Sequence, residues 1–249
     1  MNSIRKLLSW ITTIPFLIGF ALVLLVFHVF QVISIRIGYH AHNRVISSMI
    51  WWLNNVLLLS GNYIKFTNHA GKLPTDRPMI VISNHQSMYD ISPLMWYMRK
   101  HHPKFISKKE LGKGIPSVSY NLRHGGSVLI DRKKPIASIK AIENFAKRVE
   151  KNNWAAVIFP EGTRSRTGKP KPFKTKGLIT LMNHMPNALI VPISINDSWK
   201  TMRYGKFPMG LGAHIKFKVH QPIAVNSEDP IALVKHVEQT IINDIHYDK

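Results

Sequence analysis

The first part of the chain is apolar and uncharged over a length that suits a membrane helix. No Lys, Arg, Asp or Glu occurs from Leu7 to Ile35, and about 20 helical residues suffice to cross the hydrocarbon core of a bilayer. Pro15 and Gly19 are compatible with such a helix. A secretory signal peptide is the competing interpretation, but its apolar region usually has only about 7–15 residues and ends in small residues. The pattern therefore predicts a membrane helix.

A second uncharged run, from Val45 to Ile64, has a less decisive pattern. Trp51 and Trp52 suit the interface between membrane and water, whereas the polar Asn54 near its middle disfavours a lipid-facing span. Two interpretations stay open: an interfacial helix or second arm of a hairpin with the first run, and an ordinary core helix of the domain that follows. Basic residues flank the first run on both sides, so the distribution of positive charge gives no orientation.

After residue 65 the hydropathy pattern becomes that of an α/β domain. Short apolar runs rich in β-branched residues predict strands, and a strictly alternating run predicts a half-exposed edge strand. Apolar residues at helical spacing predict helices between them, and the last helix follows a favourable Asp-Pro start. The predicted strands are Met79–Ser83, Val128–Ile130, Ala155–Phe159, Leu189–Ile195 and the alternating His214–His220; the helical stripes run from Ile136 to Val149 and from Ile231 to Ile245.

This order of elements predicts the fold class. Alternating strands and helices indicate an α/β fold with a mixed, largely parallel sheet flanked by helices. We expect an N-terminal membrane helix or helical hairpin in residues 1–65, which anchors the chain, and one α/β domain in residues 66–249. A chain of 249 residues with 45% hydrophobic residues is long enough for both.

The composition narrows the partners and the chemistry. The net charge is +21, from 34 Lys and Arg against 13 Asp and Glu, which favours nucleic acid, anionic lipid or phosphorylated substrates. Aromatic residues lie mainly in apolar runs and no nucleic-acid-binding motif occurs, so we expect no nucleic acid. The absence of Cys excludes disulfides and a cysteine acyl-enzyme. Scattered histidine pairs have too few partners to predict a metal site.

The predicted strand Met79–Ser83 leads directly into His85 and Asp90. Open α/β sheets place reactive groups at the carboxyl ends of strands. Five residues on one helix turn through about 140°, so the two side chains meet only if His85 precedes the helix and Asp90 lies in its first turn. Ser87 to Asp90 reads S-x-x-D, a capping-box pattern that starts a helix at Ser87. Asp90 therefore either orients His85 or merely caps the helix.

Two later loops carry basic residues where predicted strands end. Arg132 follows Val128–Ile130, and a guanidinium there suits a phosphate, although a solvated basic turn is the alternative. The strand Ala155–Phe159 is followed by Glu161, Gly162, Thr163 and Arg164. A tight loop of this composition offers backbone N–H groups and guanidinium donors to an anion. Glu161 either braces Arg164 or contacts a substrate hydroxyl.

Together these segments resemble the ordered motifs of the glycerolipid acyltransferase family, specifically the 1-acyl-glycerol-3-phosphate acyltransferases. The resemblance covers about residues 79–195, and the four main motifs occur in order, each with a predicted strand. The matching segments are Asn84–Asp90 (N-H-x-x-x-x-D), Gly126–Arg132 (G-x-x-x-I-D-R), Phe159–Ser165 (F-P-E-G-T-R-S), Val191–Ile193 (V-P-[IV]), Ser107–Leu111 (K-K-E-L) and Phe173–Gly177 (F-K-x-G). The last has one inserted residue, so which of its lysines matches stays open.

The resemblance implies a glycerol-phosphate acyltransferase-like fold and an O-acyltransferase activity. The family transfers a fatty acyl group from acyl-CoA or acyl carrier protein to the sn-2 hydroxyl of lysophosphatidic acid, which yields phosphatidic acid. It implies His85 as general base, with Asp90 orienting it. It also implies no metal and no cofactor beyond the acyl donor. The substrate-binding residues it suggests are Lys109, Arg132, Glu161, Gly162, Thr163 and Arg164.

Two alternatives remain at this stage. In one, the enzyme acylates another lysophospholipid, a lyso-aminolipid or glycerol 3-phosphate instead of lysophosphatidic acid. In the other, the protein binds lipid without catalysis. Because the family's donor is cytosolic, we expect the active site on the cytoplasmic side of a membrane, the cell inner membrane. The basic surface suits anionic membrane lipid, since each basic residue near such a surface contributes about 1 kcal/mol.

Overall fold

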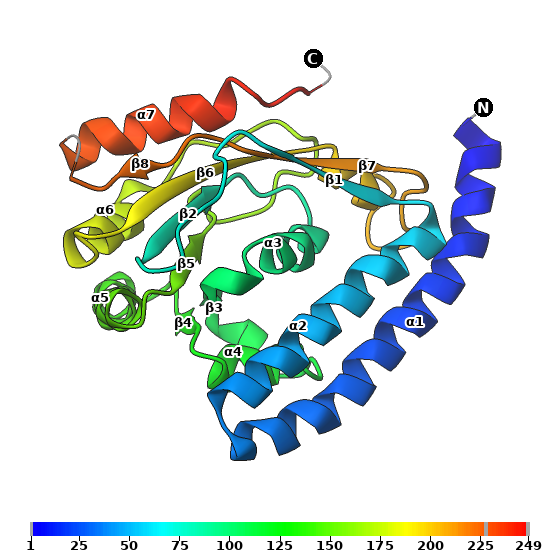
Figure 1. The fold of residues 1–249 in the computed structure, drawn as a ribbon. Coiled ribbons are helices and arrows are strands. Elements are labelled where there is room, and N and C mark those ends of the chain that lie inside the picture. Colours follow the sequence, from blue (N-terminus) through cyan, green and yellow to red (C-terminus); the bar gives the residue numbers. More distant parts are fainter. Residues whose placement is uncertain (1, 227–228, 248–249) are drawn as a thin grey trace.

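The computed structural model describes residues 2–226 and 229–247. Its strands form one mixed sheet in the order β1-β7-β6-β2-β5-β3-β4, and β8 pairs with β6 (Figure 1). The strands are β1 (Tyr63–Asn68), β2 (Met79–Ser83), β3 (Pro103–Lys108), β4 (Val128–Ile130), β5 (Ala155–Ile158), β6 (Leu189–Asn196), β7 (His214–Val219) and β8 (Ile223–Ala224). The α-helices are α1 (Asn2–Ile37), α2 (Tyr39–Val56), α3 (Ile91–Tyr97), α4 (Val118–His124), α5 (Pro135–Lys151), α6 (Thr175–His184) and α7 (Pro230–Ile242).

The sheet is largely parallel, as predicted. Strands β6, β2, β5, β3 and β4 all run in one direction. Strands β1 and β7 are parallel to each other but antiparallel to β6. The carboxyl ends of the five parallel strands therefore lie at the same edge of the sheet, so that loops far apart in sequence meet there.

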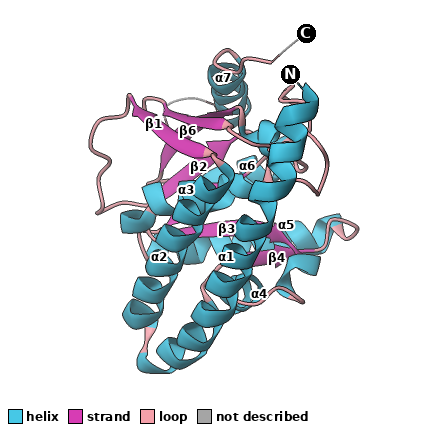
Figure 2. Ribbon diagram, turned by 90° about the vertical axis from the view of Figure 1, so that its right-hand side faces the viewer, coloured by secondary structure: helices cyan, strands magenta, loops and turns pink. Residues whose placement is uncertain are grey.

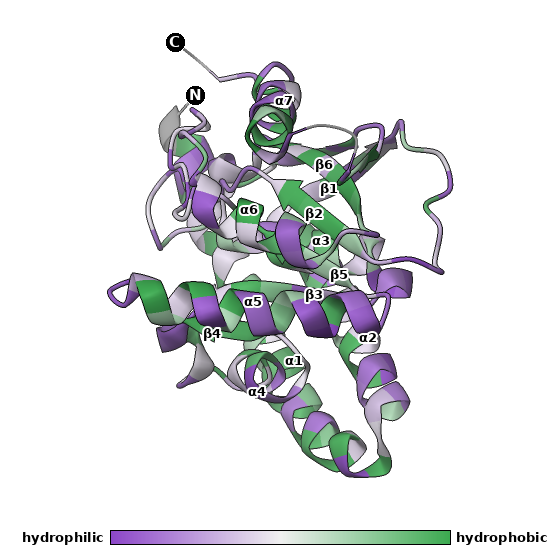
Figure 3. Cartoon of the chain, turned by 90° about the vertical axis from the view of Figure 1, so that its left-hand side faces the viewer, coloured by the Kyte–Doolittle hydropathy of each residue, from purple (hydrophilic) through white to green (hydrophobic). Residues whose placement is uncertain are grey.

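Helices cover both faces of this sheet (Figures 1 and 2). Successive side chains of a strand point to opposite faces, and β2 shows the consequence. Ile80 and Ile82 pack with α5, α6 and α7, whereas Met79 and Val81 pack with α1, α2 and α3. All four are fully buried. In Figure 3 the central strands are mostly hydrophobic, while α5 mixes hydrophilic and hydrophobic residues.

The two N-terminal apolar runs form a helical hairpin. Gly38 lies between α1 and α2 with a φ of 140°, a conformation that favours glycine. The inner face of α2, including Ile46 and Leu53, belongs to the same buried cluster as the sheet. Trp51 and Trp52 stay exposed on the outer face. The second run is therefore the second arm of a hairpin and, on its inner face, a core helix as well.

Several features differ from the sequence prediction. The alternating strand β7 is not an edge strand, because β1 pairs with it on the side away from β6. Strands β1, β3 and β8 were not predicted, and the half-exposed side chains of β1 fit its place at the edge. The expected boundary after residue 65 falls inside β1, where Tyr63 already pairs with His214. The hairpin is thus joined to the domain by a strand of the sheet.

Candidate active site

The segment after β2 folds into a tight turn that carries both the histidine and its carboxylate. Ser87 caps a single 3-10 turn (Met88–Asp90), and its hydroxyl accepts the N–H of Tyr89. The Asp90 carboxylate accepts the N–H of Ser87 in return, which completes the predicted capping box. Helix α3 follows directly. The cap therefore holds the Asp90 carboxylate close to the residues that precede Met88.

Asp90 also bonds to the imidazole, so it does more than cap the turn. The His85 Nδ1 and Asp90 Oδ2 atoms are 2.8 Å apart. The same Oδ2 atom accepts the N–H groups of Gln86 and Ser87, each at 2.8 Å. Asp90 is fully buried, while the His85 side chain is 17% exposed. The imidazole stacks on Phe159 with ring centroids 4.2 Å apart, so its plane and its Nδ1 atom are both held.

The backbone at the end of β2 is braced from both neighbouring strands. The Asn84 side chain donates to the carbonyl of Ile195 at 2.8 Å and accepts its N–H at 2.7 Å. On the other side, the Glu161 Oε1 atom accepts the N–H of His85 at 3.0 Å, and the His85 carbonyl accepts the N–H of Ser165 at 2.7 Å. These bonds fix the position of His85 relative to the loop that follows β5.

Glu161 is a buried carboxyl rather than a partner of Arg164. Its side chain is 2% exposed. Burial raises the pKa of Glu161 to about 7, although the N–H groups of His85 and Lys171 and the charge of Lys171 oppose this effect. Its Oε2 atom has no hydrogen-bond partner among the residues described. The brace that Glu161 provides is therefore to the backbone of His85.

Basic side chains gather over the loop after β5. Arg132, at the exit of β4, donates from Nη1 to the carbonyl of Gly162. The side chain of Lys174 also lies against Gly162, because a Cβ added there would be 3.1 Å from its Nζ atom. Gly162 has a φ of 72°, which together with this contact explains why a glycine occupies the position. The loop and two cations thus come together beside His85.

The remaining predicted residues lie at the surface of the same edge. Lys109 and Thr163 are exposed. Partial burial lowers the pKa of Arg132, and the nearby carboxylate of Glu110 offsets part of this effect. Arg164 is exposed and its Nη1 atom lies 3.7 Å from Met202 Sδ. Arg164 therefore points toward the segment after β6 rather than toward Glu161.

Sequence patterns missed several residues that shape this site. Gln86 accepts the N–H of Ser198 at 3.0 Å through its side-chain oxygen, which links the loops after β2 and β6. Phe159 was predicted as the end of a strand and the first residue of the F-P-E-G-T-R-S motif, without a role of its own, yet it stacks on the imidazole. Lys174, one of the lysines left open by the inserted residue, is the one against Gly162. None of these contacts has a signal in local spacing, because each depends on neighbouring strands.

Comparison with known proteins agrees with this architecture. The model of the family described as Acyltransferase matches residues 64–196. The chain is 30% identical over 192 residues to a 1-acyl-sn-glycerol-3-phosphate acyltransferase of Cocos nucifera, which covers 76% of this chain and 57% of that protein. It is 38% identical over 136 residues to one of Helicobacter pylori, covering 51% and 54% respectively. The chain thus spans about half the length of these relatives.

A solved structure is similar over the whole chain. The crystal structure of the 1-acyl-sn-glycerophosphate (LPA) acyltransferase PlsC from Thermotoga maritima aligns with a TM-score of 0.75 and 22% identity, and the alignment covers 100% of both chains. At this identity the similarity supports the fold, including the N-terminal hairpin.

We predict that Glu161→Gln removes a pH dependence of stability. The folded protein holds the Glu161 proton up to about pH 7, whereas the ordinary pKa is 4.5. The contribution of protonated Glu161 to the free energy of unfolding is therefore full below about pH 4.5 and is lost as the pH rises to about 7. Gln keeps an oxygen for the His85 N–H without a charge. Between pH 5 and 8 the variant should gain about 2–3 kcal/mol in unfolding free energy relative to wild type, measured by urea unfolding.

Glu143→Gln is the matched control for this measurement. Lys147 lowers the pKa of Glu143, so the stabilising effect of Glu143 is lost toward low pH instead. Parallel pH curves for wild type and Glu161→Gln would show that the Glu161 carboxyl is ionised throughout this range.

Proposed function

Because this chain belongs to the acyltransferase family, we propose that it transfers a fatty acyl group to the sn-2 hydroxyl of lysophosphatidic acid. The donor is acyl-CoA or acyl carrier protein, and the product is phosphatidic acid. The observation that carries the proposal is the hydrogen bond between His85 Nδ1 and Asp90 Oδ2, 2.8 Å long, at the sheet edge where Arg132 and Gly162 also meet. The names of the relatives support the choice of acceptor.

In this proposal His85 is the general base and Asp90 is its positioning residue. The ionised carboxylate accepts the Nδ1 proton, so Nε2 is left to take the proton of the acceptor hydroxyl. The hydroxyl oxygen then attacks the thioester carbonyl, and the thiol leaves with a proton returned by His85. Asp90 stabilises the imidazolium that forms in between. The chain has no Cys, and a direct transfer requires no acyl-enzyme.

The loop after β5 is the candidate for binding the negative charges of the reaction. Arg132, Arg164 and Lys174 are cations that lie along it, and guanidinium groups suit a phosphate. Lys109, at the end of β3, is a further candidate at this edge. For the oxyanion of the thioester we favour backbone N–H groups of residues 159–166, because the Val191–Ile193 segment lies inside the sheet. Holding both substrates in register contributes up to about 7–11 kcal/mol to lowering such barriers.

We also propose that residues 1–65 anchor the protein to a membrane, with the active site on the cytoplasmic side of the cell inner membrane. Within the described residues α1 is the one helix long and apolar enough to cross a bilayer by length and composition. Large apolar side chains cover its outer face, including Ile18, Leu25 and Phe30. Exposed apolar surface of this extent indicates contact with a membrane or a partner. Placing the anchor beside the catalytic domain gives the enzyme access to a lipid acceptor.

The catalytic proposal predicts loss of acyl transfer on changing the His85–Asp90 pair. His85→Ala should lower kcat by about 10²–10⁴-fold, since general base catalysis contributes that much. Asp90→Asn should cause a smaller loss, because shape is kept but the charge opposite the imidazolium is removed. Membranes with each variant are given labelled lysophosphatidic acid with acyl-CoA or acyl carrier protein, and the lipid products are separated.

The matched control is His69→Ala, an exposed histidine on the loop after β1. It should retain wild-type activity. Full activity of His85→Ala would refute the mechanism. If wild type acylates only a different acceptor, such as glycerol 3-phosphate, the chemistry stands and the acceptor is wrong.

The phosphate proposal predicts a change in KM at Arg132. Arg132→Ala should raise the KM for lysophosphatidic acid about 10–100-fold with a smaller change in kcat, because a hydrogen bond to a charged group contributes about 1.5–3 kcal/mol. Arg132→Lys should restore part of the affinity. The neighbouring exposed Lys133→Ala is the control and should leave KM unchanged. Equal KM values for Arg132→Ala and wild type would place the phosphate elsewhere.

The anchoring proposal predicts that charges on α1 release the protein from membranes. The double variant Ile18→Lys and Leu25→Lys changes exposed side chains, so folding should be retained while insertion into hydrocarbon becomes costly. Extraction of membranes at alkaline pH should leave wild type in the pellet and move much of the variant to the supernatant. Ile136→Lys, on the exposed face of α5, is the control. A variant that stays in the pellet like wild type would show that α1 is not the anchor.

A further inference from the structure

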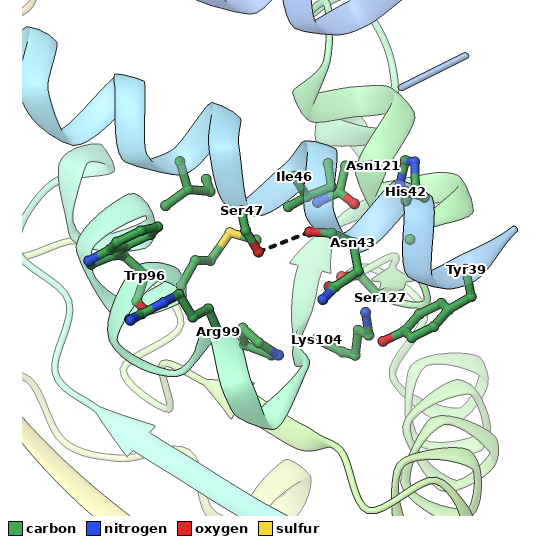
Figure 4. A pocket seen from close by; sticks show the side chains of 14 residues that line it. Tyr39, His42, Asn43, Ile46, Ser47, Trp96, Arg99, Lys104, Asn121 and Ser127 are labelled. Atoms are coloured by element: carbon green, nitrogen blue, oxygen red, sulfur yellow. Dashed lines mark hydrogen bonds between the residues drawn. The ribbon is translucent and has the colours of Figure 1, made fainter. Parts of the chain in front are cut away.

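A second polar site lies at the amino ends of the parallel strands, whereas the candidate active site lies at their carboxyl ends. It is a cavity between α2, the C-terminal part of α3 and the segments that lead into β3 and β4 (Figure 4). Lys104 lines it at the second position of β3, whereas Lys109 follows the carboxyl end of the same strand. Each strand residue spans about 3.3 Å, so the length of β3 separates the cavity from the catalytic edge.

Lys104 is a buried cation without a counter-charge among the described residues. Its side chain is 6% exposed, and its ammonium lies 5.0 Å from the ring centre of Tyr39 and 4.8 Å from that of Trp154. The charge that acts on it is the positive Arg148, and burial together with Arg148 lowers the pKa of Lys104 to about 8. The amine is thus still mostly protonated at neutral pH. A buried charge without a partner is costly, and the two rings offset only part of that cost.

The other polar groups of the lining are suited to an anion. No Asp or Glu occurs among the residues that line the cavity. The Ser127 hydroxyl accepts the N–H of Phe105 at 3.1 Å, which leaves its own proton available to donate. Arg99 lies over the ring of Trp96 and uses Nη1 for the Trp96 carbonyl, so other N–H groups of its fork remain. Asn121 adds an amide to the wall.

The cavity is narrow and open to the solvent. The centre of a water-sized group can occupy about 20 Å³ of the cavity, and all of its empty space, including the part open to solvent, is about 460 Å³. That space holds about one water-sized group. In Figure 4 Lys104 and Tyr39 turn toward one another with Ser127 beside them. A tetrahedral ion bound here therefore has to place one oxygen in this space and its other oxygens toward the solvent.

We propose that this cavity binds a phosphate group, with Lys104 as its buried ligand and Ser127 as a further donor. The combination of an ammonium and a hydroxyl suits the acceptor oxygens of a phosphate. Because α2 forms one wall and β3 the other, the bound group ties the helical hairpin to the sheet. The phosphate comes either from solution or from a lipid headgroup, since α2 packs directly on the apolar α1.

The test compares wild type with Lys104→Met, which keeps the length of the side chain and removes its charge. Unfolding temperatures of the full chain in detergent are measured with and without inorganic phosphate at constant ionic strength. Without phosphate, the variant should be at least as stable as wild type, because the uncompensated charge is gone. With phosphate, wild type should be stabilised, and its dissociation constant should be at least about 10-fold lower than that of the variant.

A second arm distinguishes the two sources of phosphate. The same proteins are reconstituted in vesicles of phosphatidylcholine alone or with phosphatidic acid. Stabilisation of wild type by phosphatidic acid but not by inorganic phosphate, lost in Lys104→Met, assigns the site to a lipid headgroup. Stabilisation by inorganic phosphate assigns it to a free ion. The exposed neighbour Lys100→Gln is the control and should respond like wild type.

Two outcomes would overturn the proposal. Equal stabilisation of wild type and Lys104→Met by either probe would place the phosphate at another site, and Arg132→Ala would then test the catalytic edge. A variant less stable than wild type by the same amount in all conditions would show that Lys104 acts only through its aromatic contacts.

Discussion

One buried carboxylate oxygen organises the candidate active site of this protein. Asp90 Oδ2 is hydrogen-bonded to the imidazole of His85 and accepts hydrogen bonds from the N–H groups of Gln86 and Ser87. The first bond positions the candidate base, and the other two close the turn that starts the following helix. The carboxylate is fully buried, and an ion in that setting is tolerated only with such donors. The same carboxylate therefore stabilises the turn and orients the imidazole.

The sheet extends this local arrangement to the rest of the site. Strands β2 and β5 are parallel neighbours, so His85 and the loop around Gly162 must emerge side by side. Arg132 reaches that loop from β4, two strands beyond β5 in the sheet. Asn84 and Gln86 connect the turn to β6 and the segment after it. Because parallel strands share the edge at which they end, residues about 80 positions apart form one surface without any long-range sequence signal.

The hairpin and the domain depend on each other in the same way. The inner face of α2 completes the core on one side of the sheet, while the outer face of α1 exposes apolar side chains. A lipid-facing surface and a core-facing surface thus occur on one pair of helices, which keeps the proposed anchor close to the proposed chemistry. The Lys104 cavity lies between these helices and the sheet, at the place where binding of an anion would affect how firmly the two parts are joined.

The sequence determined the elements whose signal is local. The apolar run of α1, the buried strands β2, β5 and β6, the Asp229 cap of α7 and the Ser87 capping box all follow from spacing within a few residues. The motifs identified the loops of the site for the same reason. The tertiary structure alone decided that β7 is internal, because its alternating hydrophobic pattern is the same whether or not another strand pairs with it. It also decided that Glu161 braces His85 and that Phe159 and Lys174 complete the site, since burial and strand pairing are set by residues distant in the chain.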